Sequence, residues 1–234
     1  MTANQMELKA IQLMADKKYE EAIDCYGELC ELEENKGFNS SNIHVLIEYA
    51  NALFKNAVQK NDIFDKQQQH YMQQSDVYKE KYTLLDVEQE DVDDFETAFD
   101  VLERAKQIAT DNQLDYTVLS RIEQLLADIC FEDSNFVQAL DSYLHCCTLY
   151  EEAKETQKLA YTYYYVAMVY EFANSPSETM NGKDSSILDI NELERIQKAK
   201  EYIEKCLQVL QSIDNEEKQD LLTDVEQKVF YLFI

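Results

Sequence analysis

The 234-residue chain is predicted to be an all-α protein made of helical hairpins. It contains only three glycines and one proline, whereas hairpin-rich β folds take glycine at many of their turns. Those glycines, at positions 27, 37 and 182, cannot form a G-x-G-x-x-G or Walker phosphate loop. Hydrophobic residues make up 45% of the chain, enough to build a core, and one helical pattern recurs four times.

The recurring pattern is an aromatic or apolar residue, then alanine three positions later, then an aromatic or apolar residue four positions further on. This spacing places all three residues on one face of a helix, where the alanine allows a neighbouring helix to approach closely. The four copies are Tyr19-Ala22-Tyr26, Phe95-Ala98-Leu102, Phe136-Ala139-Tyr143 and Ile196-Ala199-Ile203.

A second pattern precedes each copy and marks the first helix of a hairpin. A small residue lies inside an apolar helix and is followed three positions later by a larger one. The pairs are Ala10 with Leu13, Ala50 with Leu53, Ala127 with Cys130 and Ala167 with Tyr170. Together the two patterns resemble the halves of a tetratricopeptide repeat (TPR), L-G-x-x-Y and A-x-x-x-F. The predicted fold is a TPR superhelix of four helical hairpins.

The spacing of the alanines shows where the repeats are interrupted. The two alanines of a hairpin lie 12 residues apart in the first and third copies, but 48 and 32 apart in the second and fourth. Successive hairpins are separated by 28, 29 and 28 residues. We therefore predict a TPR array over residues 1–212, with an insert at about 59–94 in the second repeat and a loop at about 174–191 in the fourth. Residues 213–234 are expected to form an amphipathic helix that caps the array.

The formal net charge of −26 indicates a basic macromolecular partner. An acidic folded protein repels nucleic-acid phosphates and anionic lipid, so direct binding to either is not expected. Between Asp86 and Asp100 there are eight acidic residues and no basic one. No apolar run approaches the roughly 18 residues that a membrane span needs. The first residues lack the features of a signal peptide, so none is expected.

Metal, cofactor and catalytic sites are not predicted. The six cysteines form no C-x-x-C motif and lie mostly in apolar helices, which is typical of reduced thiols in a cytosolic or nuclear protein. The three histidines, His44, His70 and His145, share no metal-ligand spacing. No nucleophile–base pair stands out, so the chain is not expected to be an enzyme.

A TPR array whose second repeat is interrupted by an acidic stretch resembles the nuclear autoantigenic sperm protein (NASP) family of histone chaperones, the SHNi-TPR proteins. The resemblance runs from YEEAIDCYGELCELEENKG and EYANALFKNA to FETAFDVLERAKQIA and FVQALDSYLHCCTLYEEA. It implies a nuclear chaperone for histone H3, alone or paired with H4, that works in histone transport and nucleosome assembly. Shuttling through the cytoplasm and assembly into a homodimer are left open.

Two sets of residues are candidates for histone binding. The acidic segment is expected to speed encounter with a basic partner; its members are Asp86, Glu88, Glu90, Asp91, Asp93, Asp94 and Glu96. The groove of a TPR array is lined by the first helix of each repeat, at positions one after and three before the small alanine. These positions hold Asn51 and Ile47, Asp128 and Gln124, and Met168 and Tyr164, with Tyr161 one turn earlier.

Other interpretations remain open from the sequence. The acidic segment could be a solvated linker that leads into a helix, and the tyrosines could simply fill an extended repeat core. The chain could also be a TPR adaptor or scaffold for another basic protein or peptide. An adaptor of the carboxylate-clamp type needs lysine and arginine on the groove face, where Asn51, Gln124 and Asp128 are expected instead.

Overall fold

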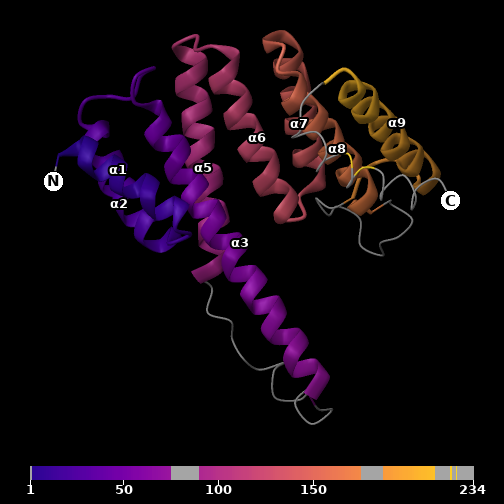
Figure 1. Cartoon of the computed structure of the whole chain (residues 1–234), viewed down its shortest axis with the longest axis horizontal. Helices are drawn as coiled ribbons and strands as arrows, with labels where there is room; N and C mark the ends of the chain where they lie inside the picture. The colour runs from indigo at the N-terminus through magenta and orange to yellow at the C-terminus, as the bar shows by residue number, and fades with distance from the viewer. Residues whose placement is uncertain (1, 75–89, 175–186, 214–221, 223–224, 226–234) are drawn as a thin grey trace. The chain divides into compact units, whose positions relative to one another are not determined.

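The computed structural model describes residues 2–74, 90–174, 187–213, 222 and 225, and for 62–74 and 90–93 it describes the backbone alone. Within these residues, every element of regular structure is a helix, apart from one isolated β-bridge between Asn174 and Ile187 (Figure 1). The helices form two compact units, residues 1–112 and 113–234. The predicted all-α helical-repeat class is therefore confirmed.

Unit 1 contains two helical hairpins. Its helices are α1 (Ala3–Ala15), α2 (Tyr19–Glu34), α3 (Ile43–Gln74) and α5 (Glu90–Asp111). α1 pairs with α2, α3 pairs with α5, and α2 also packs on α3. Thr2 begins α1 with a capping box, because its side chain accepts the Gln5 N–H and the Gln5 side chain accepts the Thr2 N–H. α3 has 32 residues and extends well past the part that packs against α5 (Figure 1).

Unit 2 contains the third and fourth hairpins. Its helices are α6 (Tyr116–Glu132), α7 (Phe136–Ala153), α8 (Thr156–Phe172) and α9 (Glu192–Gln211). α6 pairs with α7, α8 pairs with α9, and α7 packs on α8. Arg195 of α9 closes the end of α8, since its Nη1 donates to the carbonyl oxygens of Tyr170 and Glu171, each at 2.7 Å. A cation at this end of a helix also complements the helix dipole.

The small residue predicted in each helix is buried in every case. Ala10, Ala22, Ala50, Ala98, Ala127, Ala139, Ala167 and Ala199 are all 0 or 1% exposed. The large residue four positions after each second-helix alanine is buried too: Tyr26, Leu102, Tyr143 and Ile203 are at most 1% exposed. The alanine pattern therefore identified the contact face of the hairpin helices correctly.

The two uninterrupted hairpins turn without glycine. Lys17 has φ of 58° between α1 and α2, and Ser134 has φ of 59° between α6 and α7. In both turns the next N–H, of Lys18 or Asn135, donates to the carbonyl five residues before it, at 2.9 or 2.8 Å. This is the Schellman motif, in which the left-handed residue is usually glycine. A left-handed conformation costs a residue other than glycine about 1–2 kcal/mol, and packing of the two helices offsets this cost here.

The two interrupted hairpins differ at the edges of their inserts: those of the second are helical, whereas in the fourth α8 ends at Phe172 and α9 begins only at Glu192. α3 continues to Gln74 and α5 begins at Glu90, so both ends of the predicted 59–94 insert are helical. In the fourth hairpin, the Leu188 N–H donates to the Asn174 carbonyl at 3.0 Å, across the predicted 174–191 loop. Most of the predicted capping helix, 213–234, lies outside the described residues. Val225 within it is fully buried, against a cluster from α8 and α9.

Enlarging the buried alanine of one hairpin tests the packing directly. Ala139→Leu places three extra carbons between α7 and its neighbours, and we expect it to lower the free energy of unfolding by about 1–3 kcal/mol. Val137→Leu, at a site on the same helix that is 43% exposed, is the matched control and should change stability by less than about 0.5 kcal/mol. Urea denaturation followed by circular dichroism measures both. Equal effects of the two variants would contradict the assigned contact face.

Candidate functional site

The predicted acidic segment leads into the start of α5. Glu90, Asp91 and Asp93 belong to the first turn of that helix by backbone position, where carboxylates stabilise a helix through its dipole. Their side chains, and the whole of Asp86 and Glu88, lie outside the described residues. The segment is therefore in part the acidic beginning of a helix, and its role in binding a partner stays a prediction.

Two members of the acidic segment have described side chains, and they differ. Asp94 accepts a hydrogen bond from the Asn56 side-chain amide at 2.9 Å, and the same oxygen lies 3.5 Å from Lys60 Nζ. Asn56 is only 4% exposed, so this contact joins α5 to α3 in the interior of unit 1. Glu96 is exposed on the same helix. Asp94 therefore has a structural role, whereas Glu96 faces solvent.

A second concentration of charge lies on α2 and was not among the predicted sites. This helix carries seven carboxylates and no basic side chain in 16 residues. Asp24, Glu28 and Glu31 are exposed and form no ion pair with any basic side chain in the described part of the chain. α5 is similar, with eight acidic residues and two basic ones, while acidic and basic residues are equal in number on α1 and on α3. Among the described helices of unit 1, the negative charge is thus concentrated on the second helix of each hairpin. Counting the acidic residues along each predicted helix would have revealed this concentration.

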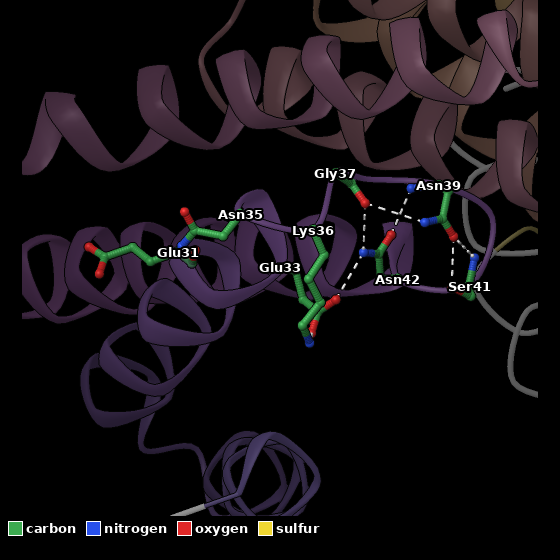
Figure 2. A network of polar contacts seen from close by, with 8 residues as sticks. All are labelled: Glu31, Glu33, Asn35, Lys36, Gly37, Asn39, Ser41 and Asn42. Atoms are coloured by element: carbon green, nitrogen blue, oxygen red, sulfur yellow. Dashed lines mark hydrogen bonds and ion pairs between the residues drawn. The ribbon is translucent and has the colours of Figure 1, made fainter.

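A polar network holds the acidic end of α2 against the start of α3 (Figure 2). Asn42, which is 7% exposed, donates from Nδ2 to a Glu33 carboxylate oxygen at 2.9 Å and to the Gly37 carbonyl at 3.2 Å. Its Oδ1 accepts the Asn39 N–H at 2.7 Å. Lys36 Nζ lies 2.6 Å from the other Glu33 oxygen. The hydrogen bonds from Asn42 and Lys36 lower the pKa of Glu33, which therefore keeps its negative charge to lower pH than an ordinary glutamate.

In unit 1, only one of the two predicted groove residues of α3 is accessible. Asn51 is partly exposed, and its Nδ2 donates to Glu48 Oε2 at 3.3 Å. Ile47 is 2% exposed, so the prediction that it lines a groove is wrong. α3 packs against both α2 and α5.

In unit 2, the predicted groove residues Gln124 and Asp128 take part in a hydrogen-bond network. Asp128 Oδ1 accepts from the Tyr143 hydroxyl at 2.7 Å and from Gln124 Nε2 at 2.8 Å. Gln124 Oε1 in turn accepts from Thr162 Oγ1 at 3.2 Å. The network links α6, α7 and α8. Burial, and then the negative charge of Asp128, raise the pKa of Tyr143, so the hydroxyl keeps its proton and remains a donor.

The predicted groove residues of α8 are only partly accessible. Tyr161 and Tyr164 pack against the apolar cluster that includes Ile203 and Val225, and Met168 is also half-buried. Tyr164 makes an edge-on ring contact with Tyr165 at 6.0 Å between centroids. Tyr161 and Tyr164 thus contribute to the packing of unit 2, as the core-filling interpretation expects, and a role in binding stays a prediction.

Two aromatic side chains of α8 that were not predicted as groove residues are more exposed. Tyr165 is 36% and Phe172 is 52% exposed. Phe131 of α6 contacts both rings, at centroid distances of 6.4 and 6.0 Å, and Tyr165 also stacks on Tyr143 at 5.5 Å. We call Phe131, Tyr165 and Phe172 the aromatic ridge. Tyr165 and Phe172 are seven residues apart, the spacing of one helix face, and this signal could have identified them.

The described residues show neither a metal-binding cluster nor a membrane-spanning helix. No group of three or more His, Cys, Asp or Glu side chains among them is placed to hold a metal ion. None of the described helices is both long and apolar enough to cross a membrane. All six cysteines are free; Cys30 is half-buried and the other five are buried. Burial raises the pKa of Cys30, Cys147 and Cys206 to about 12, which keeps these thiols protonated.

Comparison with known proteins finds a related sequence and related solved structures. No protein-family model matches the chain. Histone-binding protein N1/N2 of Xenopus laevis is 28% identical over 102 residues, which cover 42% of this chain and 17% of that protein. The chain therefore matches less than a fifth of that relative's length.

One related solved structure is that of the yeast histone chaperone Hif1, a scaffold protein recruiting protein complexes to core histones. It matches with a TM-score of 0.56 at 18% sequence identity, over 98% of this chain and 94% of Hif1. At this identity the match establishes a common fold. It supports the helical-repeat architecture that the alanine pattern predicted.

The network around Asp128 can be tested apart from any binding. Asp128→Ala leaves the buried Tyr143 hydroxyl without this acceptor, and we expect the free energy of unfolding to fall by about 1–3 kcal/mol. Asp141→Ala, at an exposed position on α7, is the matched control and should cost less than about 0.5 kcal/mol. In the Asp128→Ala background, Tyr143→Phe should cost about 1 kcal/mol less than in the wild type. If the two substitutions change the free energy of unfolding additively, the hydrogen bond between Tyr143 and Asp128 contributes nothing to stability.

Proposed function

We propose that this chain is a histone chaperone that binds H3, or H3 paired with H4, and shields histone charge during transport and nucleosome assembly. Two observations support the proposal: a related protein is named for histone binding, and a histone chaperone shares the fold. The proposal involves no catalytic step, cofactor, nucleic acid or membrane. It places the chain in the nucleus, with shuttling to the cytoplasm during histone transport.

The structural observation that carries the proposal is the distribution of charge in unit 1. Free histones are rich in lysine and arginine, and clustered carboxylates raise the local concentration of such a partner and speed its encounter. The carboxylates concentrate on α2 and α5, and Asp24, Glu28, Glu31 and Glu96 are exposed there. Each exposed ion pair contributes only about 0–1 kcal/mol. The acidic helices should therefore govern the association rate and its salt dependence more than the final affinity.

Selectivity for H3–H4 needs contacts that depend on shape. We propose that the predicted groove residues supply these contacts: Asn51, Gln124, Asp128, Tyr161, Tyr164 and Met168. To them we add the aromatic ridge, in which Tyr165 and Phe172 are more exposed than Tyr161 and Tyr164. Aromatic side chains bury a large area at low entropic cost and commonly form the hot spots of interfaces. An amphipathic histone helix that binds the members of this set belonging to unit 2 is the helix-in-groove mode of recognition.

A competition experiment tests the proposal. Fluorescently labelled H3–H4 is bound to the chain at about 150 mM salt, where long-range attraction between exposed charges is screened within about 8 Å. Unlabelled H3–H4 should then displace it at a concentration at least about tenfold lower than a basic protein of equal charge, which corresponds to about 1.4 kcal/mol of selectivity. If both competitors act equally, the chain is a general acidic binder or an adaptor for other basic proteins, and the histone proposal is wrong.

Neutralising the carboxylates at the start of α5 tests whether they govern the association rate, while shape-dependent contacts govern the dissociation rate. We expect the variant with Glu90→Gln, Asp91→Asn, Asp93→Asn and Glu96→Gln to associate with H3–H4 several-fold more slowly and with a flatter salt dependence. The dissociation rate should change little. Asp94 is left intact because it bonds Asn56 inside unit 1.

The control for this variant changes the total charge equally in unit 2. It carries Asp141→Asn, Glu152→Gln, Glu192→Gln and Glu204→Gln, all at exposed positions. Stopped-flow fluorescence measures both rates. The same slowing in the two variants would mean that total charge, and not the acidic helices of unit 1, steers the partner.

The aromatic ridge should contribute mainly to the affinity for H3–H4. Tyr165→Ala together with Phe172→Ala removes two exposed rings, and we expect H3–H4 to bind about 10–100-fold more weakly, since hot-spot side chains contribute about 2 kcal/mol or more. Leu193→Ala, at a position of unit 2 that is 77% exposed, is the control and should leave binding unchanged. Isothermal titration calorimetry provides the affinities. Unchanged binding in the ridge variant would exclude the ridge from the interface.

A further inference from the structure

The aromatic ridge lies where two helices of unit 2 end. Phe131 is the last residue but one of α6, and Phe172 is the last residue of α8. The planes of the Tyr165 and Phe172 rings stand at 76° and 74° to the plane of Phe131. Both outer rings are in part exposed, at 36% and 52%. Exposed rings can bind either an apolar surface or a cation, and the charges around them decide between the two.

The charges at the end of α6 favour a cation. No basic residue lies in the last turn of α6 or of α8, although the C-terminal end of a helix is the negative end of its dipole and attracts lysine and arginine. Arg195 of α9 reaches the end of α8, where it is 9% exposed and donates to two carbonyl oxygens. At the end of α6, by contrast, Glu132 and Asp133 follow Phe131 directly and add negative charge to the dipole.

Asp133 shows the effect of these surroundings on a carboxylate. Its side chain is at the surface, yet neighbouring atoms remove part of the water from the carboxyl group, and this desolvation raises the pKa of Asp133. Asp133 forms no ion pair with a basic side chain in the described part of the chain. A cation beside it would stabilise the charged form, and the carboxylate would attract that cation in turn.

The stack behind Tyr165 carries a negative charge as well. Tyr165 lies against the buried ring of Tyr143, with the two planes 10° apart, so only its opposite face is available to a partner. The Tyr143 hydroxyl donates to Asp128 Oδ1 at 2.7 Å. The face of an aromatic ring is already the negative part of its quadrupole, and a carboxylate bound to the stack adds to the attraction for a cation.

We propose that the aromatic ridge and Asp133 form a binding site for an arginine side chain of the basic partner. The guanidinium lies on the exposed rings of Tyr165 and Phe172, and its N–H groups donate to the Asp133 carboxylate. Arginine suits this site better than lysine, because a planar guanidinium stacks on a ring and still donates to a carboxylate in its own plane. The inference rests on the proposed function in taking the partner to be basic, and it names the side chain that the ridge selects.

Fluorination of Phe172 tests the proposal, because fluorine withdraws electron density from the ring and leaves its size nearly unchanged. Phenylalanine with one, two or three ring fluorines is placed at position 172 of the full chain. Binding of a fluorescent hexa-arginine peptide is then measured by anisotropy at about 150 mM salt. We expect the Kd to rise with each fluorine, reaching about 2–5 times its original value with three. An unchanged Kd would mean that the ridge offers only an apolar contact, and the proposal would be wrong.

The matched control carries the same fluorinated series at Phe136. This ring also meets Phe131 at a steep angle, with 5.7 Å between centroids, but it is only 8% exposed. Fluorine there alters the contacts between rings without facing the peptide, so the Kd should stay constant. An equal rise in the two series would show that fluorine acts through the packing of the rings, which would also overturn the proposal.

Asp133→Asn tests the carboxylate, and we expect it to raise the Kd for hexa-arginine about 2–5-fold. Asp141→Asn removes the same charge from an exposed position on α7 and should change the Kd by less than about 1.5-fold. Hexa-lysine has the same charge as hexa-arginine but cannot stack in the same way, so both Asp133→Asn and the fluorines at Phe172 should affect it less. Equal effects of the two asparagine variants, or of the two peptides, would contradict the proposed arginine site.

The outcomes separate this inference from the histone proposal. If hexa-arginine binding weakens stepwise with fluorination while H3–H4 shows no advantage over a basic protein of equal charge, the arginine site is supported and the histone proposal is wrong. If H3–H4 binds selectively while fluorination of Phe172 changes neither its affinity nor that of hexa-arginine, the histone proposal is supported and the arginine site is wrong.

Discussion

Close approach of two helices at a fully buried alanine is the constraint on which both units depend. The eight alanines on these contact faces are at most 1% exposed, and each second-helix alanine is followed by a large residue that is buried as completely. Where two helices meet at a buried alanine, a larger side chain would not fit. The alanine therefore fixes which face of each helix turns inward. The exposed charged and aromatic side chains lie on the faces that remain.

This constraint divides the carboxylates into two kinds. Asp94 and Asp128 bond buried or half-buried partners and hold helices together, and the network at Glu33 joins α2 to α3. Asp24, Glu28 and Glu31 of α2 have no such structural contact with a described basic side chain. In a chain with 47 acidic residues, the carboxylates able to attract a basic partner are those that packing does not use. In unit 1 such carboxylates lie on α2 and α5, and this position is more informative than the total number of acidic residues.

The sequence predicted most of the fold because the alanine pattern reports packing within a hairpin, which is a local property. It predicted the site less well, because exposure depends on neighbours from distant parts of the chain. Tyr164 and Tyr165 are adjacent on α8, yet the first packs against the cluster containing Val225 and the second is exposed. A rotation of 100° about the helix separates them, and only the surrounding helices decide which faces solvent. The bond of Asp94 to Asn56 spans 38 residues and has no local signature.

The central claim is that the acidic helices of unit 1 attract a histone and that shape-dependent contacts then select it. A crosslinking map of the chain in complex with H3–H4, using a reagent that joins lysines to carboxylates, tests this claim most directly. The account predicts that histone lysines crosslink mainly to Asp24, Glu28, Glu31 and the acidic start of α5. Crosslinks spread evenly over the exposed carboxylates, or gathered on Asp141, Glu152 and Glu204 of unit 2, would contradict it.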